Sequence, residues 1–427
     1  MKEALAAART ARPRGPPRLP VTSAQHTCNL SLPADASVGI IGGGLSGAVL
    51  AASLSSRGVR STVYDTGKHG LGGRLATRDS GLPGGLVFDH ASQYFAVTDP
   101  RFAELVKRWA ASGAVRQWTG AVHSVSSRTS TPLAGERWVA GRGFRHLVTS
   151  ILESDAPLAT VRRPCWIEAM VPGERRAWQL LQGGRIVGEH DFVVVAHNGK
   201  CANKLMGGAG VPKLDAAMRS MKLNSIWATL VAFDSSLGAS FEGAYVEGMP
   251  ALAWAANNTA KLGRSGPECW TLLSTAAYGR SNKCPQENVP PATSAKVAQE
   301  MLAALTAALR VDLPTPTFVR TQLWGAALPT NSPRTPCLFD GAARAGMCGD
   351  WLLGSTIEAA ALSGMAMAQR ISDAVAAGGD DLSGLSCGLD APLTPLLMHD
   401  IGTTDLPARR EYTSRGQTQG RRAAPAR

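Results

Sequence analysis

A glycine-rich turn between an apolar strand and a helix constrains this chain more than any other feature. Residues 38–41 form a short apolar run, the letters GGGLSG occupy 42–47, and residues 48–56 are good helix formers without a break. Strand, G-x-G-x-x-G turn and helix in this order are typical of a dinucleotide-binding unit. A second apolar strand at 61–64 ends in Asp65, about 20 residues past the glycines, where such a unit keeps the acid that accepts ribose hydroxyls.

Each glycine of this turn has a physical task. Gly42 permits the tight turn, Gly44 lets the backbone approach a pyrophosphate, and Gly47 lets helix and strand pack closely. The phosphates would lie at the positive N-terminus of the helix. The acid at Asp65 favours an unphosphorylated ribose, so FAD or NAD fits better than NADP. The predicted cofactor-binding residues of this unit are Gly42, Gly44, Leu45, Ser46, Gly47 and Asp65.

The formal charge of +12 raises the question of an anionic partner. Residues 1–30 carry five basic residues and one acid, and residues 401–427 carry six and two, so these tails hold two thirds of the excess. Tails rich in Arg, Ala, Pro and Gly favour solvated disorder over nucleic-acid recognition. The 427 residues contain no apolar run long enough to cross a bilayer, and we expect two or three lobes around a full core.

The first 30 residues are rich in Arg and Ala and carry a single acid, Glu3, which resembles an organelle transit peptide. A chloroplast location is one expectation, and an ordinary disordered extension of a cytoplasmic protein is the other. The eight cysteines form no C-x-x-C pair, and the eight histidines show no metal-ligand spacing. We therefore expect reduced thiols and no metal site.

Glycines and one arginine follow the acid. The run LGGRLATR at 71–78 would let backbone amides and the Arg74 guanidinium close over the far side of the same pyrophosphate, which favours FAD over NAD. Further along, the apolar run at 192–196 is typical of a strand buried on both faces, so it returns to the parallel sheet. The first domain is thus split, and antiparallel strands with an amphipathic helix at 293–309 suit a substrate lobe.

The sequence therefore predicts an α/β fold in which a Rossmann-like FAD-binding domain is split by an antiparallel-sheet substrate domain. A long helix from about Thr356 to Ala376 would complete the first of these. The expected divisions are a disordered or transit segment at 1–34, FAD-binding parts at 35–98, 161–200 and 330–378, an interlobe or substrate segment at 99–160, the substrate domain at 201–329 and a largely disordered tail at 379–427.

Six motifs occur in order along the chain. They are GGGLSG at 42–47, VYD at 63–65, LGGRLATR at 71–78, FDHASQYF at 88–95, VVVAHNG at 193–199 and MCGDWLLGSTIEAAALSG at 347–364. Together they resemble the renalase-like branch of the FAD-dependent amine oxidase superfamily, including plant and algal relatives. The resemblance implies a fold of the p-hydroxybenzoate hydroxylase type with FAD as cofactor. It also implies that a small donor, such as an isomer of a reduced nicotinamide dinucleotide, transfers hydride to the flavin and that O2 accepts the electrons.

The resemblance assigns roles to single positions in the phosphate region. Gly73 and Arg74 would hold the phosphates and the ribityl region of FAD. Met170 would flank the adenine. Asp350, which follows Gly349, would bind the ribityl-phosphate chain.

Around the flavin ring the resemblance adds a second set of residues. The helix that starts near Glu358 and Ala359 would direct its amides at the ring. Gln93, Tyr94 and Trp324 would lie beside the ring and are the predicted catalytic residues. One departure concerns the strand facing the flavin, where renalases usually read His-Arg-Trp or His-Lys-Trp and this chain reads Gln-Leu-Trp at 322–324. The aromatic wall is kept, but the change leaves the substrate open.

Several residues have a second, purely structural interpretation. His90 would be either a flavin-side proton donor or a scaffold residue that caps the next helix. Cys348 would either form a thioether bond to the flavin or be a small buried residue. Lys222 holds a water near the flavin or is a surface lysine. Four tryptophans would either line a substrate pocket or belong to the core, namely Trp227, Trp254, Trp270 and Trp324.

Three functions are compatible with the sequence. The first is a renalase-like oxidoreductase acting on a reduced nicotinamide derivative. The second is an amine oxidase or desaturase acting on a plastid metabolite. The third is a FAD-binding protein with little turnover that uses its basic tails to dock on an anionic partner.

Overall fold

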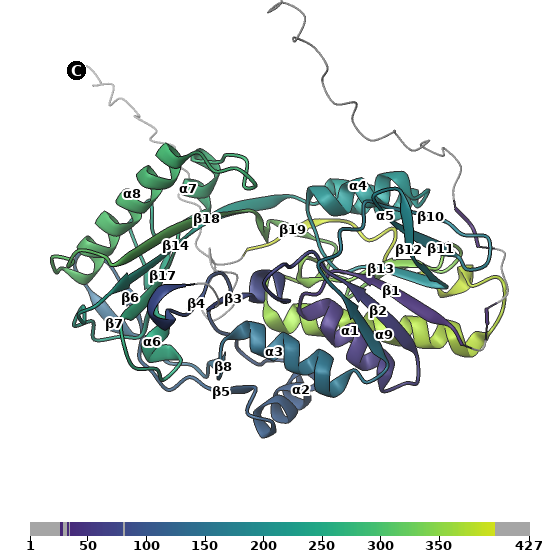
Figure 1. Cartoon of the computed structure of the whole chain (residues 1–427), viewed down its shortest axis with the longest axis horizontal. Coiled ribbons are helices and arrows are strands. Elements are labelled where there is room, and N and C mark those ends of the chain that lie inside the picture. Colours follow the sequence, from purple (N-terminus) through teal and green to yellow (C-terminus); the bar gives the residue numbers. More distant parts are fainter. Residues whose placement is uncertain (1–25, 29–31, 34, 80–81, 398–427) are drawn as a thin grey trace, which may run out of the picture.

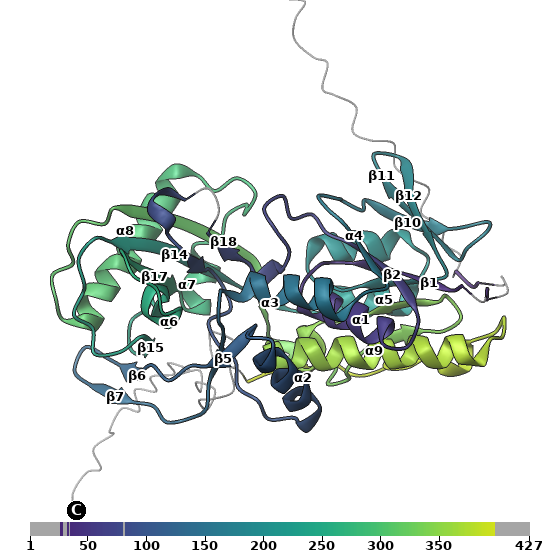
Figure 2. The same ribbon diagram turned by 60° about the horizontal axis from the view of Figure 1, so that its bottom comes forward.

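The structure is a computed structural model that describes residues 26–28, 32–33, 35–79 and 82–397. Two lobes lie side by side, one built on a mainly parallel sheet and the other on a mainly antiparallel sheet (Figures 1 and 2). Among the described residues no helix is long and apolar enough to span a bilayer. In the same part of the chain no cluster of His, Cys, Asp or Glu side chains could hold a metal ion.

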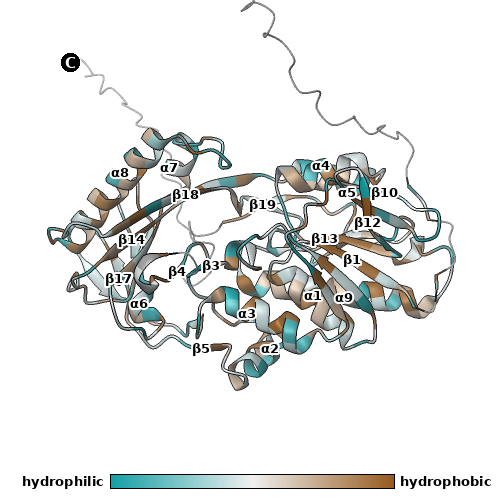
Figure 3. Ribbon diagram, viewed as in Figure 1, coloured by the Kyte–Doolittle hydropathy of each residue, from teal (hydrophilic) through white to brown (hydrophobic). Residues whose placement is uncertain are grey.

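The first lobe contains a six-stranded sheet assembled from separate stretches of the chain. Its strands, in spatial order, are β20 (Leu338–Asp340), β21 (Ala345–Met347), β13 (Phe192–Val195), β1 (Ser37–Ile41), β2 (Arg60–Tyr64) and β9 (Ala159–Arg162). All neighbours pair in parallel except β20 and β21. Figure 3 shows the central strands β1 and β13 as strongly hydrophobic, as expected for a sheet covered on both faces.

Alternate side chains of these strands enter two different cores. Ile40 and Val194 pack in one core, whereas their chain neighbours Ile41 and Val195 pack in the other. The first core is completed by α1 (Leu45–Ser55), α2 (Pro100–Ala111), α3 (Phe144–Ser150) and α9 (Ile357–Ala377). The second is completed by β10 (Ala169–Pro172), β11 (Trp178–Gln182), β12 (Arg185–His190), α4 (Lys200–Gly208) and α5 (Pro212–Ser220). The long helix α9 lies beside α1 in Figures 1 and 2.

The second lobe is a seven-stranded sheet with one long helix over one face. Its strands, in spatial order, are β18 (Phe318–Pro329), β14 (Leu223–Phe233), β17 (Glu268–Leu273), β16 (Trp254–Asn257), β15 (Gly243–Val246), β6 (Val122–Val125) and β7 (Ser130–Pro132). Only β15 and β6 pair in parallel. The helix α8 (Pro291–Leu309) buries Val297, Met301 and Leu305 against this sheet, as its apolar stripe predicts.

Short elements complete both lobes. The two-stranded pairs are β3 (Thr77–Arg78) with β4 (Phe88–Asp89), β5 (Val115–Gln117) with β8 (Trp138–Ala140), and β19 (Asn331–Ser332) with β22 (Thr394–Pro395). The short helices are α6 (Asn258–Lys261) and α7 (Ala276–Ser281). Single 3₁₀ turns occur at Gly73–Leu75, Pro83–Gly85, Asp350–Leu352 and Ser383–Leu385, and one π-helical turn at Ile151–Asp155. The predicted fold class, a split Rossmann-like domain with an antiparallel-sheet domain, is thus confirmed.

The structure moves two of the predicted boundaries between lobes. The helices α4 and α5, expected in the substrate domain, pack in the second core of the first lobe because Leu205, Leu214 and Met218 are buried against β13 and its neighbours. The segment 99–160 is not one unit. Its helices α2 and α3 cover the first lobe, whereas β6 and β7 extend the sheet of the second.

The described parts of both predicted disordered segments are packed on the body. The amide of Cys28 donates to the carbonyl of Ala342 at 2.8 Å. Cys387 and Phe339 exchange two backbone hydrogen bonds of 2.9 and 3.0 Å, so the expectation of disorder is wrong for the stretch 379–397. The transit-like residues 1–25 and the last residues 398–427 lie outside the described part of the chain.

Candidate active site

A cavity of about 400 Å³ lies between the two lobes. This volume lies within the range of small-molecule sites, roughly 300 to 1,000 Å³. The predicted residues that line the cavity are Gly42, Gly44, Leu45, Ser46, Asp65, Gly73, Arg74, Gln93, Tyr94, Trp324, Gly349 and Asp350. Those that do not line it are Gly47, Met170, Glu358 and Ala359. The fold therefore brings most of the predicted site together, although its members are far apart in sequence.

The glycine turn after β1 has the conformation that its predicted roles require. Gly42 has φ +124°, a backbone angle that L side chains rarely adopt. A Cβ at Gly47 would lie 2.1 Å from the carbonyl oxygen of Gly42, so only glycine allows helix α1 to approach the strand this closely. A Cβ at Gly44 would meet nothing nearer than the Gly72 oxygen at 3.9 Å. The backbone at Gly44 is therefore open to a ligand in the cavity.

The carboxylate of Asp65 is fixed at one end of the cavity by backbone amides. Its Oδ2 accepts from the amide of Gly43 at 2.8 Å, and its Oδ1 accepts from the amide of Gly67 at 2.7 Å. The Asp65 carbonyl in turn accepts from the Cys165 amide at 2.7 Å. These bonds hold the carboxylate in one orientation and leave lone pairs for hydroxyl donors.

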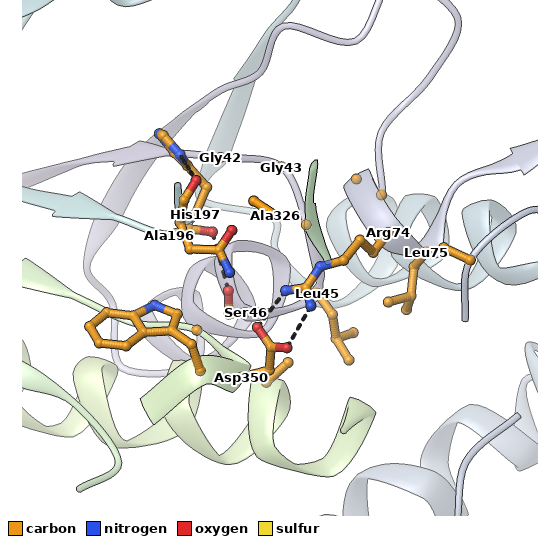
Figure 4. Close-up of a pocket in the computed structure, with 18 of the residues that line it drawn as sticks. Gly42, Gly43, Leu45, Ser46, Arg74, Leu75, Ala196, His197, Ala326 and Asp350 are labelled. Atoms are coloured by element: carbon orange, nitrogen blue, oxygen red, sulfur yellow. Dashed lines mark hydrogen bonds and ion pairs between the residues drawn. The ribbon is translucent and has the colours of Figure 1, made fainter. Parts of the chain in front are cut away.

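Arg74 and Asp350 form an ion pair in the middle of the cavity wall (Figure 4). Arg74 Nη2 lies 2.5 Å from Asp350 Oδ1, and Nη1 lies 2.8 Å from Oδ2. Nη1 also donates to the carbonyl of Ala327 in the second lobe at 2.7 Å. Burial alone would lower the pKa of Arg74, but the charge and hydrogen bonds of Asp350 outweigh it and raise the pKa. The guanidinium is therefore a permanent cation beside the open backbone of Gly73, where a Cβ would meet nothing within 4 Å.

The start of helix α9 reaches the cavity through residues other than those predicted. The side chain of Glu358 accepts from the amides of Thr98 and Asp99 at 2.7 and 2.9 Å, so it points away from the cavity. The amide of Ala359 donates to the hydroxyl of Thr356 at 3.0 Å, which caps the helix. Thr356 and its neighbour Ile357 line the cavity instead. The long helix starts where the sequence predicts, and the cavity is lined by residues on either side of Glu358 and Ala359, with Ala360 as the third.

Met170 does not reach the cavity. Its side chain is 1% exposed and belongs to the core beneath the sheet. Cys165, Trp166 and Ile167, which precede β10, line the cavity near Asp65. The adenine-side position carried over by resemblance therefore falls in the core.

The second-lobe end of the cavity is aromatic and held by internal hydrogen bonds. Gln93 Nε2 donates to the carbonyl of Asp89 at 2.8 Å, and its Oε1 accepts from Trp254 Nε1 at 3.3 Å. The hydroxyl of Tyr94 is hydrogen-bonded to that of Tyr245. Trp324 Nε1 donates to the carbonyl of His90 at 3.3 Å. The polar atoms of these residues are thus engaged within the protein, and their flat faces remain for a ligand.

A buried ion pair that the sequence did not reveal supports this end of the cavity. Lys261 is completely buried and lies 3.0 Å from the carboxylate of Asp89. It also donates to the carbonyl of Gln93 at 3.2 Å. Asp89 Oδ1 accepts from the hydroxyl of Thr77 at 2.6 Å and from the amide of Phe144 at 3.1 Å. The pair therefore joins α6 of the second lobe to the hairpin of β3 and β4 and fixes the segment that carries Gln93.

The structure decides most of the double interpretations in favour of a structural role. Cys348 is fully buried and Lys222 is exposed, and neither lines the cavity. The helix after His90 is capped by Asp99, which accepts from the Arg101 amide at 2.8 Å, so the capping role predicted for His90 is wrong. The tryptophans in the core are Trp227, Trp254 and Trp270, and Trp324 lines the cavity.

The residues present fit a dinucleotide that carries a flat ring. The open glycine backbone and the cation of Arg74 suit phosphates, and the fixed carboxylate of Asp65 suits ribose hydroxyls. The aromatic end suits a flat ring system. No carboxylate other than Asp65 and Asp350 lines the cavity in the described part of the chain.

Comparisons with known proteins agree with this geometry. Residues 40–109 match the family model of an NAD(P)-binding Rossmann-like domain. The fold is similar to that of cyclohexylamine oxidase from Brevibacterium oxydans IH-35A, with a TM-score of 0.57 and 13% identity over 79% of this chain and 99% of that one. It is also similar to wild-type putrescine oxidase bound to putrescine, with a TM-score of 0.55 and 11% identity over 79% of this chain and 98% of that one.

Reduced UDP-galactopyranose mutase matches with a TM-score of 0.52 and 11% identity, covering 68% of this chain and 82% of that one. Identities this low establish the fold and not the activity. The chain therefore contains a dinucleotide-binding Rossmann-like domain within an amine oxidase fold.

Proposed function

We propose that this chain is a renalase-like, FAD-dependent oxidoreductase that accepts hydride from a reduced nicotinamide derivative or a similar small donor and passes the electrons to O2. The observation that carries this proposal is the continuous cavity, which has a phosphate-binding wall in the first lobe and an aromatic wall in the second. The amine oxidase fold supports a flavin as the cofactor.

The residues of the first lobe would bind and orient the cofactor. Asp65 would accept the adenosine ribose hydroxyls, and the amides of the glycine turn would face the pyrophosphate. Arg74, held in place by Asp350, would keep its positive charge beside the phosphates. When bound, FAD supplies the ring that accepts a hydride.

The residues of the second lobe would orient a donor and exclude water. Tyr94 and Trp324 offer flat faces, and Ile226 and Leu273 make this end apolar. Hydride transfer from an electron-rich carbon needs proximity and a dry site more than an acid or a base. An ammonium substrate would need a nearby anion, and the two carboxylates that line the cavity lie in the first lobe, one of them paired with Arg74. This favours a dihydronicotinamide over an amine.

The test is the visible spectrum of the purified holoprotein, recorded without oxygen before and after adding a mixture of dihydronicotinamide dinucleotide isomers. We expect the flavin band to bleach and, on admission of air, to return with hydrogen peroxide. Reduction by cyclohexylamine or putrescine but not by dihydronicotinamides would support an amine oxidase or desaturase instead. A flavin that neither class reduces would support a FAD-binding protein with little turnover. Protein that holds no flavin even after reconstitution would overturn the proposal altogether.

A further inference from the structure

Strand β18 leads from the aromatic wall of the cavity to a group of positive charges. Trp324, Gln322 and Arg320 alternate along one face of the strand, about 7 Å apart in each step. Their partners on β14 are Ile226, Ala228 and Leu230, whose side chains belong to the cores on the cavity side of the sheet. The intervening Leu323 packs on the opposite face against α8.

A second guanidinium approaches this row from the neighbouring hairpin. Arg78 Nη2, on β3, donates to Gln322 Oε1 at 2.7 Å. Its Nε is buried and makes no hydrogen bond. Within the described residues neither Arg78 nor Arg320 takes part in an ion pair, whereas Arg145 nearby is paired with Asp79 at 2.7 Å. Gln322 thus neighbours two cations, the half-buried Arg78 and the exposed Arg320, for which the described residues supply no carboxylate partner.

Burial and like charge act together on two side chains of this group, Arg78 and His90. Burial is the main reason that the pKa of Arg78 is lowered, and the charges of Arg320 and Arg145 add to the fall. His90, whose ring lies 5.1 Å from that of Trp324, is buried, and burial followed by the charge of Arg78 lowers its pKa to about 3. His90 is therefore neutral and supplies no compensating charge. An anion between Arg78 and Arg320 would relieve the repulsion.

We propose that Arg78 and Arg320 form a subsite for a phosphate group of the hydride donor, whose ring lies against Trp324 at the adjoining end of the cavity. This inference rests on the proposed function and narrows its substrate to a phosphate-bearing dihydronicotinamide nucleotide. Gln322, which Arg78 contacts, is about 7 Å along β18 from Trp324. Arg320 is about 7 Å further along the same strand. Uncharged and cationic donors lack the group that this pair attracts.

Two donors that differ only in one phosphate provide the test. Dihydronicotinamide mononucleotide and dihydronicotinamide riboside are mixed without oxygen with the oxidised holoprotein, and the second-order rate constant of flavin bleaching is measured for each. We expect the wild type to prefer the mononucleotide by about tenfold or more, since each arginine would add a charge-assisted hydrogen bond. Arg78→Met and Arg320→Met should each reduce this preference about tenfold, and Arg78→Lys should retain part of it. Added salt should also reduce the preference.

The matched control is Arg128→Met, in an exposed turn between β6 and β7, which should keep the wild-type preference. Equal rate constants for both donors in the wild type would overturn the subsite while leaving the proposed function intact. An unchanged preference in both arginine-to-methionine variants would overturn it as well.

A binding measurement keeps the subsite testable if neither donor reduces the flavin, which would be a failure of the proposed function. Inorganic pyrophosphate is titrated into the holoprotein and the heat of binding is measured. Binding that both variants weaken at least tenfold supports the subsite. The absence of binding to the wild type, or equal binding to Arg78→Met, overturns it.

Discussion

The ammonium nitrogen of Lys261 lies 3.0 Å from Oδ2 of Asp89, and neither side chain reaches solvent. Lys261 belongs to the second lobe, and the same carboxylate accepts from the amide of Phe144 in the first. The backbone of Gln93 accepts a hydrogen bond from the ammonium of Lys261. Burial lowers the pKa of Lys261, and the negative charge of Asp89 opposes this fall. This buried ion pair therefore links the two lobes close to the aromatic wall of the cavity.

Replacing Lys261 by Met should leave the Asp89 carboxylate buried without a cation. We expect the free energy of unfolding to fall by about 3 to 5 kcal/mol, the usual effect of breaking a buried pair. Urea denaturation followed by tryptophan fluorescence measures this change. The control is Lys107→Met, because the ion pair of Lys107 with Glu104 is at the surface and contributes little. Equal denaturation midpoints for the two variants would contradict the prediction.

Gly47→Ala should prevent the close packing of helix α1 on the strand before it. The added Cβ would lie 2.1 Å from the Gly42 oxygen, so the helix or the turn must move. We expect a loss of at least about 3 kcal/mol, the upper range for overpacking, together with loss of the bound flavin. Thermal unfolding and the ratio of flavin to protein absorbance test this. Gly208→Ala is the control, since a Cβ there meets nothing within 4 Å, and it should unfold at or above the wild-type temperature.

Arg74→Met should weaken FAD binding, because it removes the cation next to the open backbone of Gly73 and leaves Asp350 without its partner. Since hydrogen bonds to charged groups contribute about 1.5 to 3 kcal/mol, we expect the dissociation constant to rise about tenfold to a hundredfold. Titration of the apoprotein with FAD, followed by flavin fluorescence, gives this constant. Arg74→Lys should lie between Met and wild type, because it keeps the charge but loses the two-pronged geometry. A dissociation constant in Arg74→Met equal to that of the wild type would show that Arg74 does not bind the cofactor.

Acid should destabilise the protein through its buried histidines. Burial, and then the charge of Arg78, lowers the pKa of His90 to about 3. Burial, and then the charge of Arg162, lowers the pKa of His190 to about 4. In the unfolded chain a histidine titrates near pH 6.5, so the unfolded state binds more protons below that pH. The contribution of these groups is complete above about pH 6.5 and is lost as the pH falls toward 4, by up to about 1.4 kcal/mol per pH unit for each histidine.

Thermal or urea unfolding at pH 7, 6 and 5 measures this slope. In His90→Gln the slope should be shallower, because one of the histidines that take up a proton on unfolding is gone. A slope identical to that of the wild type would mean that His90 is not the group that takes up the proton.

One thiol should react faster than its exposure indicates. Cys387 Sγ lies 3.8 Å from Cys337 Sγ. The hydrogen bond from Cys337 lowers the pKa of Cys387 to about 6. Burial opposes this fall, and the charge of Arg370 adds to it. Burial raises the pKa of Cys201, although that residue is exposed. At pH 7 iodoacetamide should therefore label Cys387 before Cys201.

Peptide mass mapping over time identifies the labelled site. Arg370→Gln should slow the labelling of Cys387 and leave the rate at Cys201 unchanged. Earlier labelling of Cys201 in the wild type would contradict the assignment of the thiolate to Cys387.

Features that depend on a few neighbouring residues could be predicted from the sequence. The turn at Gly42 and the packing at Gly47 follow from local backbone chemistry, and each is found where it was expected. The buried stripe of α8 follows from helical periodicity. Local rules of this kind predicted the glycine-rich wall of the cavity.

Features that depend on distant pairing could not be predicted. Nothing near Lys261 in the sequence indicates a buried cation, because its partner Asp89 is brought to it only by the tertiary fold. Ile167, just before β10, lines the cavity, whereas Met170 pairs with Leu180 of β11 inside the strand, and this pairing is not evident from composition. The stretch 379–397 is polar, yet Leu382 is buried in the first core, and Cys387 pairs with Phe339 at the edge strand β20.

The order of strands in the six-stranded sheet has a consequence for the synthesis of this protein. Strand β13 must pair with β21, which leaves the ribosome only after the whole second lobe has been made. Until then β1, α1 and β13 lack α9 and expose apolar faces, so the first lobe depends on long-range contacts that form slowly. Most strands of the second lobe are contiguous, from β14 to β18, and can assemble earlier. The half of the molecule that emerges first is therefore the half that finishes folding last, and the nascent chain should depend on chaperones until α9 emerges.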